Sequence, residues 1–435
     1  MDNPYILMLI ALALLAVIDL VVGVSNDAVN FLNSAIGSKA ISIRNIMIIA
    51  SIGVFFGAIT SSGMMEVARK GIFNPEMFMF QDIMFIFMAV MITDILLLDV
   101  FNTLGMPTST TVSIVFELLG AAVVISLIKI SQNDTESFNA IWNYINYEKA
   151  SMIIFGILLS VVVAFSVGAL VQFVSRLIYS FNFEKRPNYI NALFGGFAIT
   201  AITYFIIIKG MKGTPFYVDV KHLIEYNTLL IITGSFLLWT LISQLLITFF
   251  NINILKLIIG IGTFSLAMAF SGNDLVNFVG VPIAAWNSYQ VWETSGISAT
   301  TFSMGVLAQK VPSNVFLLLF AGAIMVVTLW TSSKARNVIK TGIDLSRQGE
   351  GHEKFKPNPL SRLVVRASMG INSGLSYIIP AKTIAFVDSK FQKPVIELPK
   401  DKTYELPAFD MVRASVNLIV AGILISIATS LKLPL

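Results

Sequence analysis

The chain has 435 residues, of which 56% are hydrophobic and 12% charged, with mean hydropathy +0.81 and a formal net charge of +4. So few charges cannot cover a soluble protein of this size, and apolar runs of about 20 residues match the thickness of a bilayer core. The runs are continuous rather than alternating, which excludes a transmembrane β-barrel. The chain has no cysteine, which excludes disulfides, thiolate metal sites and a cysteine nucleophile. The small net charge gives no indication of a nucleic-acid partner.

The apolar runs predict an all-α, multi-pass protein of the cell (inner) membrane, with the lipid bilayer as its surroundings. Ten spans are expected, at about 4–24, 45–65, 82–101, 108–130, 150–180, 189–208, 228–250, 252–271, 313–332 and 408–431. Residues 25–40 and 272–300, after the first and eighth spans, are rich in Gly, Asn and Ser. They are too polar to cross alone and too apolar for solvated loops. Broken or re-entrant half-helices near the membrane midplane are therefore expected there.

Residues 333–406 are clearly not membrane-spanning, since they hold 13 of the chain's 29 Lys and Arg residues beside 7 acidic ones. This composition predicts a small, folded cytoplasmic insert by the positive-inside rule. The stretch YIIPAKTIAFV indicates some β-structure within it. With this segment inside, the first span runs inward and the eighth runs outward.

A polar motif occurs twice. Residues 25–31 read SNDAVNF and 272–278 read GNDLVNF, identical at five of seven positions with an offset of 247 (273 − 26). One copy alone could be a helix cap. Two copies on oppositely directed spans indicate inverted-topology repeats, which in transporters hold the substrate between them near the midplane. Acidic residues at membrane depth also point to function, because burying their charge is costly.

A second polar motif, GMPTSTTVS, spans residues 105–113. Pro107 is expected to break the helix, and Thr108, Ser109, Thr110 and Thr111 then supply four hydroxyls at the start of the next span. Hydroxyls at a helix N-terminus can complete a polar cup for a tetrahedral oxyanion. The alternative is ordinary capping and bonding back to the helix. The nearby repeat favours a binding site.

On these motifs the chain resembles the inorganic phosphate transporter (PiT) family, which carries duplicated G-A-N-D-V-A-N-A and P-V-S-T-T-H signatures. SNDAVN and GNDLVN match the first signature, and PTSTT matches the second. The resemblance covers 1–332 and resumes at about 408. It implies a secondary active transporter that imports inorganic phosphate by alternating access, in symport with a cation. Sodium is the favoured coupling ion and a proton is the alternative.

The resemblance implies one shared binding site and no other cofactor. Its predicted substrate-binding residues are Asn26, Asp27, Asn30, Ser109, Thr110, Thr111, Asn273, Asp274 and Asn277, with Asp27 and Asp274 also as sodium ligands. Three other functions are weighed against this one: transport of a related oxyanion such as sulfate, a non-transporting receptor or scaffold, and an intramembrane enzyme. The last is set aside because H-E-x-x-H and G-x-S-x-G are both missing. A homodimer is left open.

The chain departs from the family pattern at four positions. Val112 replaces the histidine of the second signature, and Val54 stands where the family often has Glu. Ser25 and Gly272 replace the alanine of A-N-D. These changes put the coupling ion and any proton dependence in question.

Three further acids, Asp19, Asp94 and Asp99, fall in predicted spans. Asp94 is interpreted either as part of an ion path or as a partner in helix packing. The expected organisation has a first repeat at 1–131, linker helices at 132–251, the first part of the second repeat at 252–332, the insert at 333–406 and a continuation at 407–435.

The end of the chain, SLKLPL, is compared with the first half of the sequence. Pro107 lies 80 residues after Asp27 (107 − 27), and Pro434 lies 160 after Asp274 (434 − 274). The insert accounts for most of the difference, so a second STT motif is expected beyond Leu435. The chain is therefore interpreted as a fragment of a longer transporter.

Overall fold

The computed structural model is helical, as predicted, with only two isolated β-bridges outside its helices and turns among the described residues. The described residues are 3–60, 72–181, 186–207, 222–224, 226–308, 315–349, 355–392 and 406–430. Pro434, on which the expected truncation rests, lies outside these ranges.

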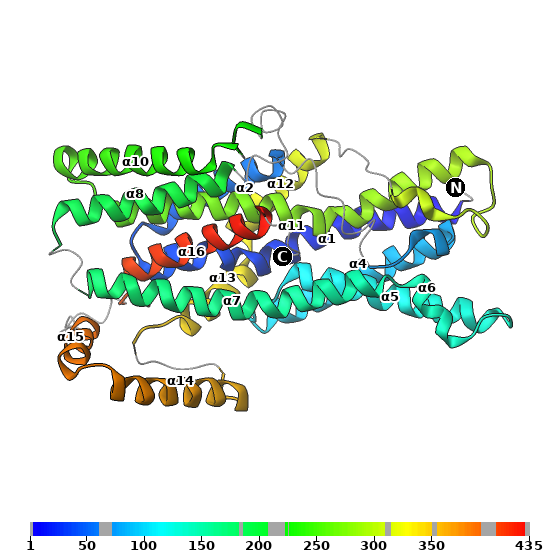
Figure 1. Cartoon of the computed structure of the whole chain (residues 1–435). Coiled ribbons are helices and arrows are strands. Elements are labelled where there is room, and N and C mark those ends of the chain that lie inside the picture. The colour runs from blue at the N-terminus through cyan, green and yellow to red at the C-terminus, as the bar shows by residue number, and fades with distance from the viewer. Residues whose placement is uncertain are drawn as a thin grey trace.

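Most of the long helices run in one common direction and form an elongated bundle (Figure 1). The longer helices of the chain are α1 (Pro4–Ser38), α2 (Ile43–Thr60), α4 (Phe80–Thr103), α5 (Thr110–Gln132), α7 (Tyr147–Tyr179), α8 (Asn188–Phe205), α10 (Thr228–Phe250), α11 (Ile254–Ser295), α12 (Val315–Thr331), α13 (Ser333–Leu345), α14 (Pro359–Ile378), α15 (Ala381–Phe391) and α16 (Met411–Ser430). The shorter elements are η1 (Pro75–Met77), η2 (Phe138–Ala140), α6 (Ile141–Tyr144) and η5 (Met304–Ala308).

Each of the ten predicted spans overlaps a helix. In the part of the chain that the structure describes, eight helices are long and apolar enough to cross a membrane: α1, α2, α4, α5, α7, α10, α11 and α16. A ninth crossing would be formed by α12 together with α13, which are bent by 69° at their junction. The helix α8 is less apolar and packs against α10, α11 and α16.

The predicted half-helices at 25–40 and 272–300 are wrong. Helix α1 continues unbroken to Ser38, and α11 continues to Ser295. At 1.5 Å per residue, their 35 and 42 residues span about 52 and 63 Å, which exceeds the bilayer core. The polar stretches stay helical because α1 and α11 are packed among other helices, and an unbroken helix satisfies its own backbone.

The centre of the bundle pairs helices from the two sequence halves. Helix α2 packs along α11, α12 packs along α1, and α1 contacts α11 directly. Helix α4 flanks α1 and α16 flanks α11. This exchange of partners is the arrangement expected of two inverted repeats.

The approach of α2 to α11 depends on Gly57 in α2. A Cβ atom on Gly57 would overlap the backbone carbonyl of Met268 in α11, which cannot move aside as a side chain can. The neighbouring Val54 is fully buried, and its carbonyl accepts a hydrogen bond from Ser271 Oγ at 2.7 Å. The valine that replaces the family's glutamate therefore packs within the α2–α11 contact.

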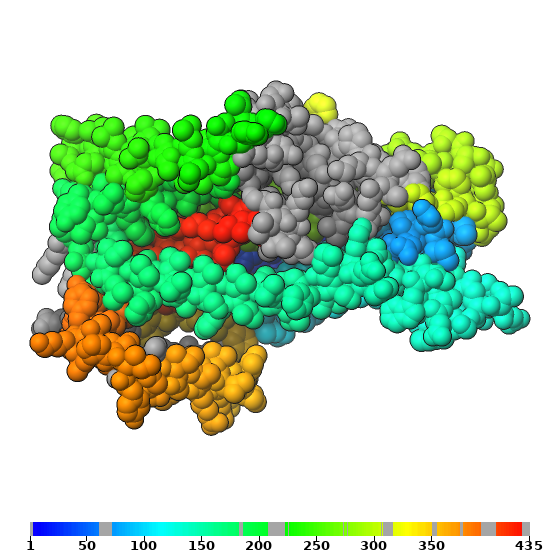
Figure 2. Space-filling model, in the orientation of Figure 1, coloured from blue at the N-terminus to red at the C-terminus, as the bar shows by residue number. Residues whose placement is uncertain are grey.

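The β-structure expected in the insert is also wrong, because the described part of 333–406 is helical. In YIIPAKTIAFV, Pro380 separates α14 from α15. Apolar residues such as Leu360, Leu363 and Val364 recur at helical rather than alternating spacing. Figure 2 shows α14 as a lobe beside α7, away from the main bundle.

Helix α13, at the start of the predicted insert, belongs instead with the bundle. It packs along α1, where Gly342 faces Val29 of the first motif. In contrast, α7 and α10 expose long rows of apolar side chains on the outside of the bundle. These outer faces suit contact with lipid.

Candidate substrate and cation site

The two copies of the motif meet where α1 and α11 cross. Phe278 packs against Gly23, where a Cβ atom would overlap its ring. The ring centroids of Phe31 and Phe270 lie 6.2 Å apart. Gly23 corresponds to Phe270 and Phe31 to Phe278 at the repeat offset of 247 (270 − 23, 278 − 31). The two contacts are therefore the same contact, made once from each copy.

The crossing brings together the two repeated aspartates. Asp27 and Asp274 are 6% and 7% exposed, and Asp274 acts electrostatically on Asp27. Oδ2 of Asp27 accepts a hydrogen bond of 3.0 Å from Oγ1 of Thr110. Two buried carboxylates from distant parts of the chain thus lie close enough to act on each other electrostatically.

The N-terminus of α5 lies against both motif helices. Ser109 is the N-cap residue, and its Oγ accepts from the N–H of Val112 at 3.3 Å. Thr110 contacts Asp27 of α1, while Oγ1 of Thr111 accepts from Nδ2 of Asn277 in α11 at 3.0 Å. The N–H groups of the first helical turn have no partner within the helix, so they favour an anion.

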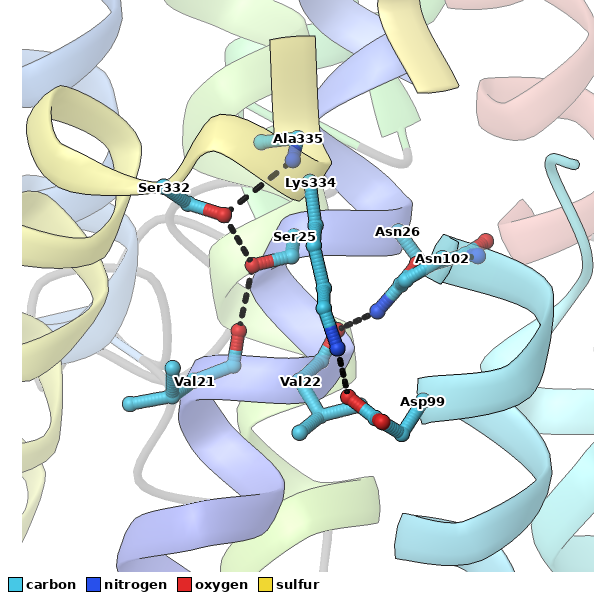
Figure 3. Close-up of polar contacts among 9 residues, drawn as sticks. All are labelled: Val21, Val22, Ser25, Asn26, Asp99, Asn102, Ser332, Lys334 and Ala335. Carbon is cyan, nitrogen blue, oxygen red and sulfur yellow. Dashed lines mark hydrogen bonds and ion pairs between the residues drawn. The ribbon is translucent and has the colours of Figure 1, made fainter. Parts of the chain in front are cut away.

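Asn26 is occupied by the turn between α4 and α5. Its Nδ2 donates to Oδ1 of Asn102 at 2.8 Å and to the carbonyl of Met106 at 3.2 Å. Its Oδ1 accepts from the N–H of Thr108 at 2.8 Å. Asn102 in turn donates to the carbonyl of Val22 at 2.7 Å, as Figure 3 shows. Through these hydrogen bonds Asn26 holds the start of α5 against α1.

The structure brings only some of the other predicted site residues together. Five converge at the crossing: Asp27, Thr110, Thr111, Asp274 and Asn277. Asn30 is exposed and Ser109 caps α5, as the alternative interpretation of the hydroxyl motif expected. The side chain of Asn273 lies outside the described residues.

The junction of α12 and α13 adds contacts that sequence reasoning missed. Ser332 Oγ lies 2.7 Å from Ser25 Oγ and accepts from the N–H of Ala335 at 3.1 Å, capping α13 (Figure 3). Lys334 reaches from α13 to Asp99 on α4, with Nζ 2.5 Å from Oδ1. A serine pair after an apolar run is a helix-start signal that could have revealed this junction.

The comparisons with known proteins agree with this architecture. The chain is 26% identical over 202 residues to a protein of Thermococcus kodakarensis named as a phosphate permease, covering 46% of this chain and 44% of that one. A protein of the same name from Pyrococcus horikoshii is 24% identical over 310 residues, covering 68% of each chain. The first alignment thus spans less than half of the relative's length.

A solved structure described as the sodium-dependent phosphate transporter superposes with TM-score 0.56 at 19% identity, covering 97% of this chain and 89% of that chain. It shows that the fold is shared. The sequence model of the phosphate transporter family matches residues 23–342, from the first motif into α13, which is 320 of 435 residues (342 − 23 + 1). This multi-pass membrane protein belongs to the phosphate transporter family.

Proposed function

We propose that this chain imports inorganic phosphate across the cell (inner) membrane by symport with sodium, using the crossing of α1 and α11 as its binding site. One observation carries the proposal. Asp27 and Asp274, one from each motif copy, share a buried site with the hydroxyl-rich N-terminus of α5. The family membership supports phosphate as the substrate.

The charges of the site require a co-bound cation. Neither motif contains Lys or Arg, so phosphate would bind beside two carboxylates without a basic side chain from the motifs. Two like unit charges about 4 Å apart repel by about 4 kcal/mol at an effective dielectric of 20. Sodium held by Asp27 and Asp274 would remove this repulsion and complete the anion's site. Each ion would then bind more tightly when the other is present.

Sodium fits these residues better than a proton does. Carboxylate oxygens are hard ligands, and the site offers them together with the hydroxyl of Thr110 as a support. Val112 stands where the family has a histidine, so the first turn of α5 carries no titratable imidazole. The structural relative's description as sodium-dependent supports the same choice.

Phosphate is favoured over sulfate by its proton. At neutral pH phosphate retains a proton that it can donate to a carboxylate, and sulfate has none to donate. A site built around Asp27 and Asp274 therefore discriminates between the two oxyanions by hydrogen bonding. Removing such a donor from a buried site leaves an acceptor unpaired, which costs about 1–3 kcal/mol.

Alternating access would move one repeat against the other. The contacts that would change include Ser25 with Ser332 and Lys334 with Asp99, since they join the α12–α13 junction to the first repeat. We also propose that the chain can form a homodimer.

The test is uptake of radiolabelled phosphate into proteoliposomes, driven by an inward sodium gradient or by a matched potassium gradient. We expect uptake with sodium, inhibition by arsenate and none by sulfate. Uptake that is equal in both gradients would contradict sodium symport. Stronger competition by sulfate than by arsenate would favour the sulfate transporter. A cellular function that needs the insert but neither Asp27 nor Asp274 would favour the receptor or scaffold.

A further inference from the structure

A second group of acids lies deeper along α1, separate from the crossing site. It consists of Asp19 on α1, Asp94 on α4 and Glu117 on α5, and we call it the carboxyl triad. Asp19 precedes Asp27 by eight residues (27 − 19), about 12 Å along the helix. Asp19 and Asp94 are both 0% exposed.

The three carboxyl groups are linked through Asp94. Asp94 lies within hydrogen-bonding contact of both Asp19 and Glu117. Ser113 Oγ lies 2.7 Å from Oδ1 of Asp94 and 2.7 Å from Oε1 of Glu117. A hydroxyl has one hydrogen, so Ser113 can donate to only one of these acids at a time.

The triad lacks donors for its remaining oxygens. Both oxygens of Asp19, Oδ2 of Asp94 and Oε2 of Glu117 are buried and have no hydrogen-bond partner among the residues that the structure describes. Ionised carboxylates only accept, so a contact between two of them becomes a hydrogen bond only if one carries a proton. Fully ionised, the triad would place three negative charges together in the protein interior, which is very unfavourable.

Among the described residues, the charged groups that act on the triad are its own members and Asp27, on which Asp274 acts in turn. No described basic side chain therefore offsets the negative charge of the triad. On the same and adjoining helices, Lys129 pairs with Asp82 at 2.7 Å and Lys334 pairs with Asp99. The described residues hold no group of three or more acids or histidines arranged to bind a metal ion.

We propose that the carboxyl triad is a proton-binding site, in which Asp94 shares a proton with Asp19 or Glu117. Protonation converts one acceptor into a donor and removes one negative charge. It therefore supplies a missing hydrogen-bond donor and reduces the repulsion among the three carboxyl groups.

A groove with a mostly apolar lining lies beside the triad. It has a volume of about 720 Å³, runs between α4 and α5, and includes Thr108, Ser109, Ser113 and Glu117 in its lining. It therefore extends from the N-terminus of α5, next to the crossing site, to the carboxyl group of Glu117.

Infrared difference spectroscopy on the full chain in lipid tests this proposal, because the C=O stretch of a protonated carboxyl is distinct from the bands of a carboxylate. We expect a protonated-carboxyl band at neutral pH that disappears on alkalinisation and shifts in heavy water. Asp19→Asn, Asp94→Asn and Glu117→Gln should each remove or shift the band. Asp99→Asn is the matched control, since this acid is also on α4 but is paired with Lys334.

Several results would overturn the proposal. One is a spectrum with no protonated-carboxyl band, and another is a band that none of the three triad variants changes. A third is a band that disappears when sodium replaces choline at constant pH, which would make the triad a sodium site. Glu117→Gln is the most informative variant, because Glu117 is only half-buried and its replacement should preserve the fold.

The infrared test and the uptake test can fail independently of each other. Asp27→Asn should abolish uptake and retain a triad band, shifted at most, because Asp27 acts on Asp19 but is not a member of the triad. Failed uptake with an intact band would therefore count against the proposed function alone, and a missing band with normal uptake would count against the triad alone.

Discussion

Replacing Asn26 by alanine tests whether this residue positions the α4–α5 turn or binds the substrate. Asn26 makes three hydrogen bonds, to Asn102, Met106 and Thr108, and all three hold the α4–α5 turn against α1. Asn26→Ala removes all of them at a position that is 0% exposed. We therefore expect the substitution to destabilise the protein rather than to weaken phosphate binding selectively.

The magnitude follows from the number of bonds. At about 0.5–1.5 kcal/mol for each net hydrogen bond, three lost bonds correspond to about 1.5–4.5 kcal/mol of unfolding free energy. Asn33→Ala on the same helix is the control, because Asn33 donates one long hydrogen bond of 3.4 Å to Ser346. Its loss should cost less than about 1 kcal/mol.

Thermal unfolding of the purified variants, followed by phosphate binding on the folded fraction, distinguishes the two roles. We expect a lower melting temperature for Asn26→Ala than for Asn33→Ala, with phosphate affinity reduced less than in Asp27→Asn. An Asn26→Ala protein with the wild-type melting temperature and no phosphate binding would refute this reasoning and make Asn26 a ligand.

Two further substitutions test the contacts between the repeats. Gly57→Ala should destabilise the protein by about 1–3 kcal/mol, because the new methyl group overlaps the carbonyl of Met268, whereas Gly120→Ala faces open space and should be neutral or stabilising. Equal melting temperatures for these two variants would contradict the close approach of α2 and α11. Lys334→Met should change stability by less than about 1 kcal/mol, since Lys334 and Asp99 are 41% and 47% exposed, but should alter the maximal rate of phosphate uptake. An unaltered rate would show that this ion pair does not change during transport.

The membrane fold and the meeting of the two motif copies could be predicted because short stretches of the sequence carry both signals. Apolar runs of the right length became helices at all ten predicted positions. The repeated motif carried enough identity to place Asp27 beside Asp274, although 247 residues separate them (274 − 27). A short motif that occurs twice can predict a contact between distant parts of the chain, whereas hydropathy alone cannot predict such a contact.

Continuity of the helices could not be predicted from composition. Gly, Asn and Ser in 25–40 and 272–300 indicated breaks, but a helix keeps its backbone hydrogen bonds when neighbouring helices bury its polar face. The break in the second half occurs instead after Thr331, where α12 meets α13 at 69°.

The roles of individual polar residues depended on partners far away in the chain. Asn26 belongs to the repeated motif, yet its partner Asn102 is 76 residues distant and no local pattern links them. Asp99 pairs with Lys334, from a segment whose charge suggested a separate insert. β-Branched residues around Pro380 suggested strands, but the proline divides two helices there.

Phosphate binding to the purified protein, measured with sodium and with choline, tests the shared site most directly. We expect sodium to strengthen phosphate binding, and Asp27→Asn and Asp274→Asn each to abolish that effect, because one site needs both carboxylates. Phosphate binding that is equally strong in choline, or sodium dependence that survives in either variant, would contradict a single site formed by the two motifs.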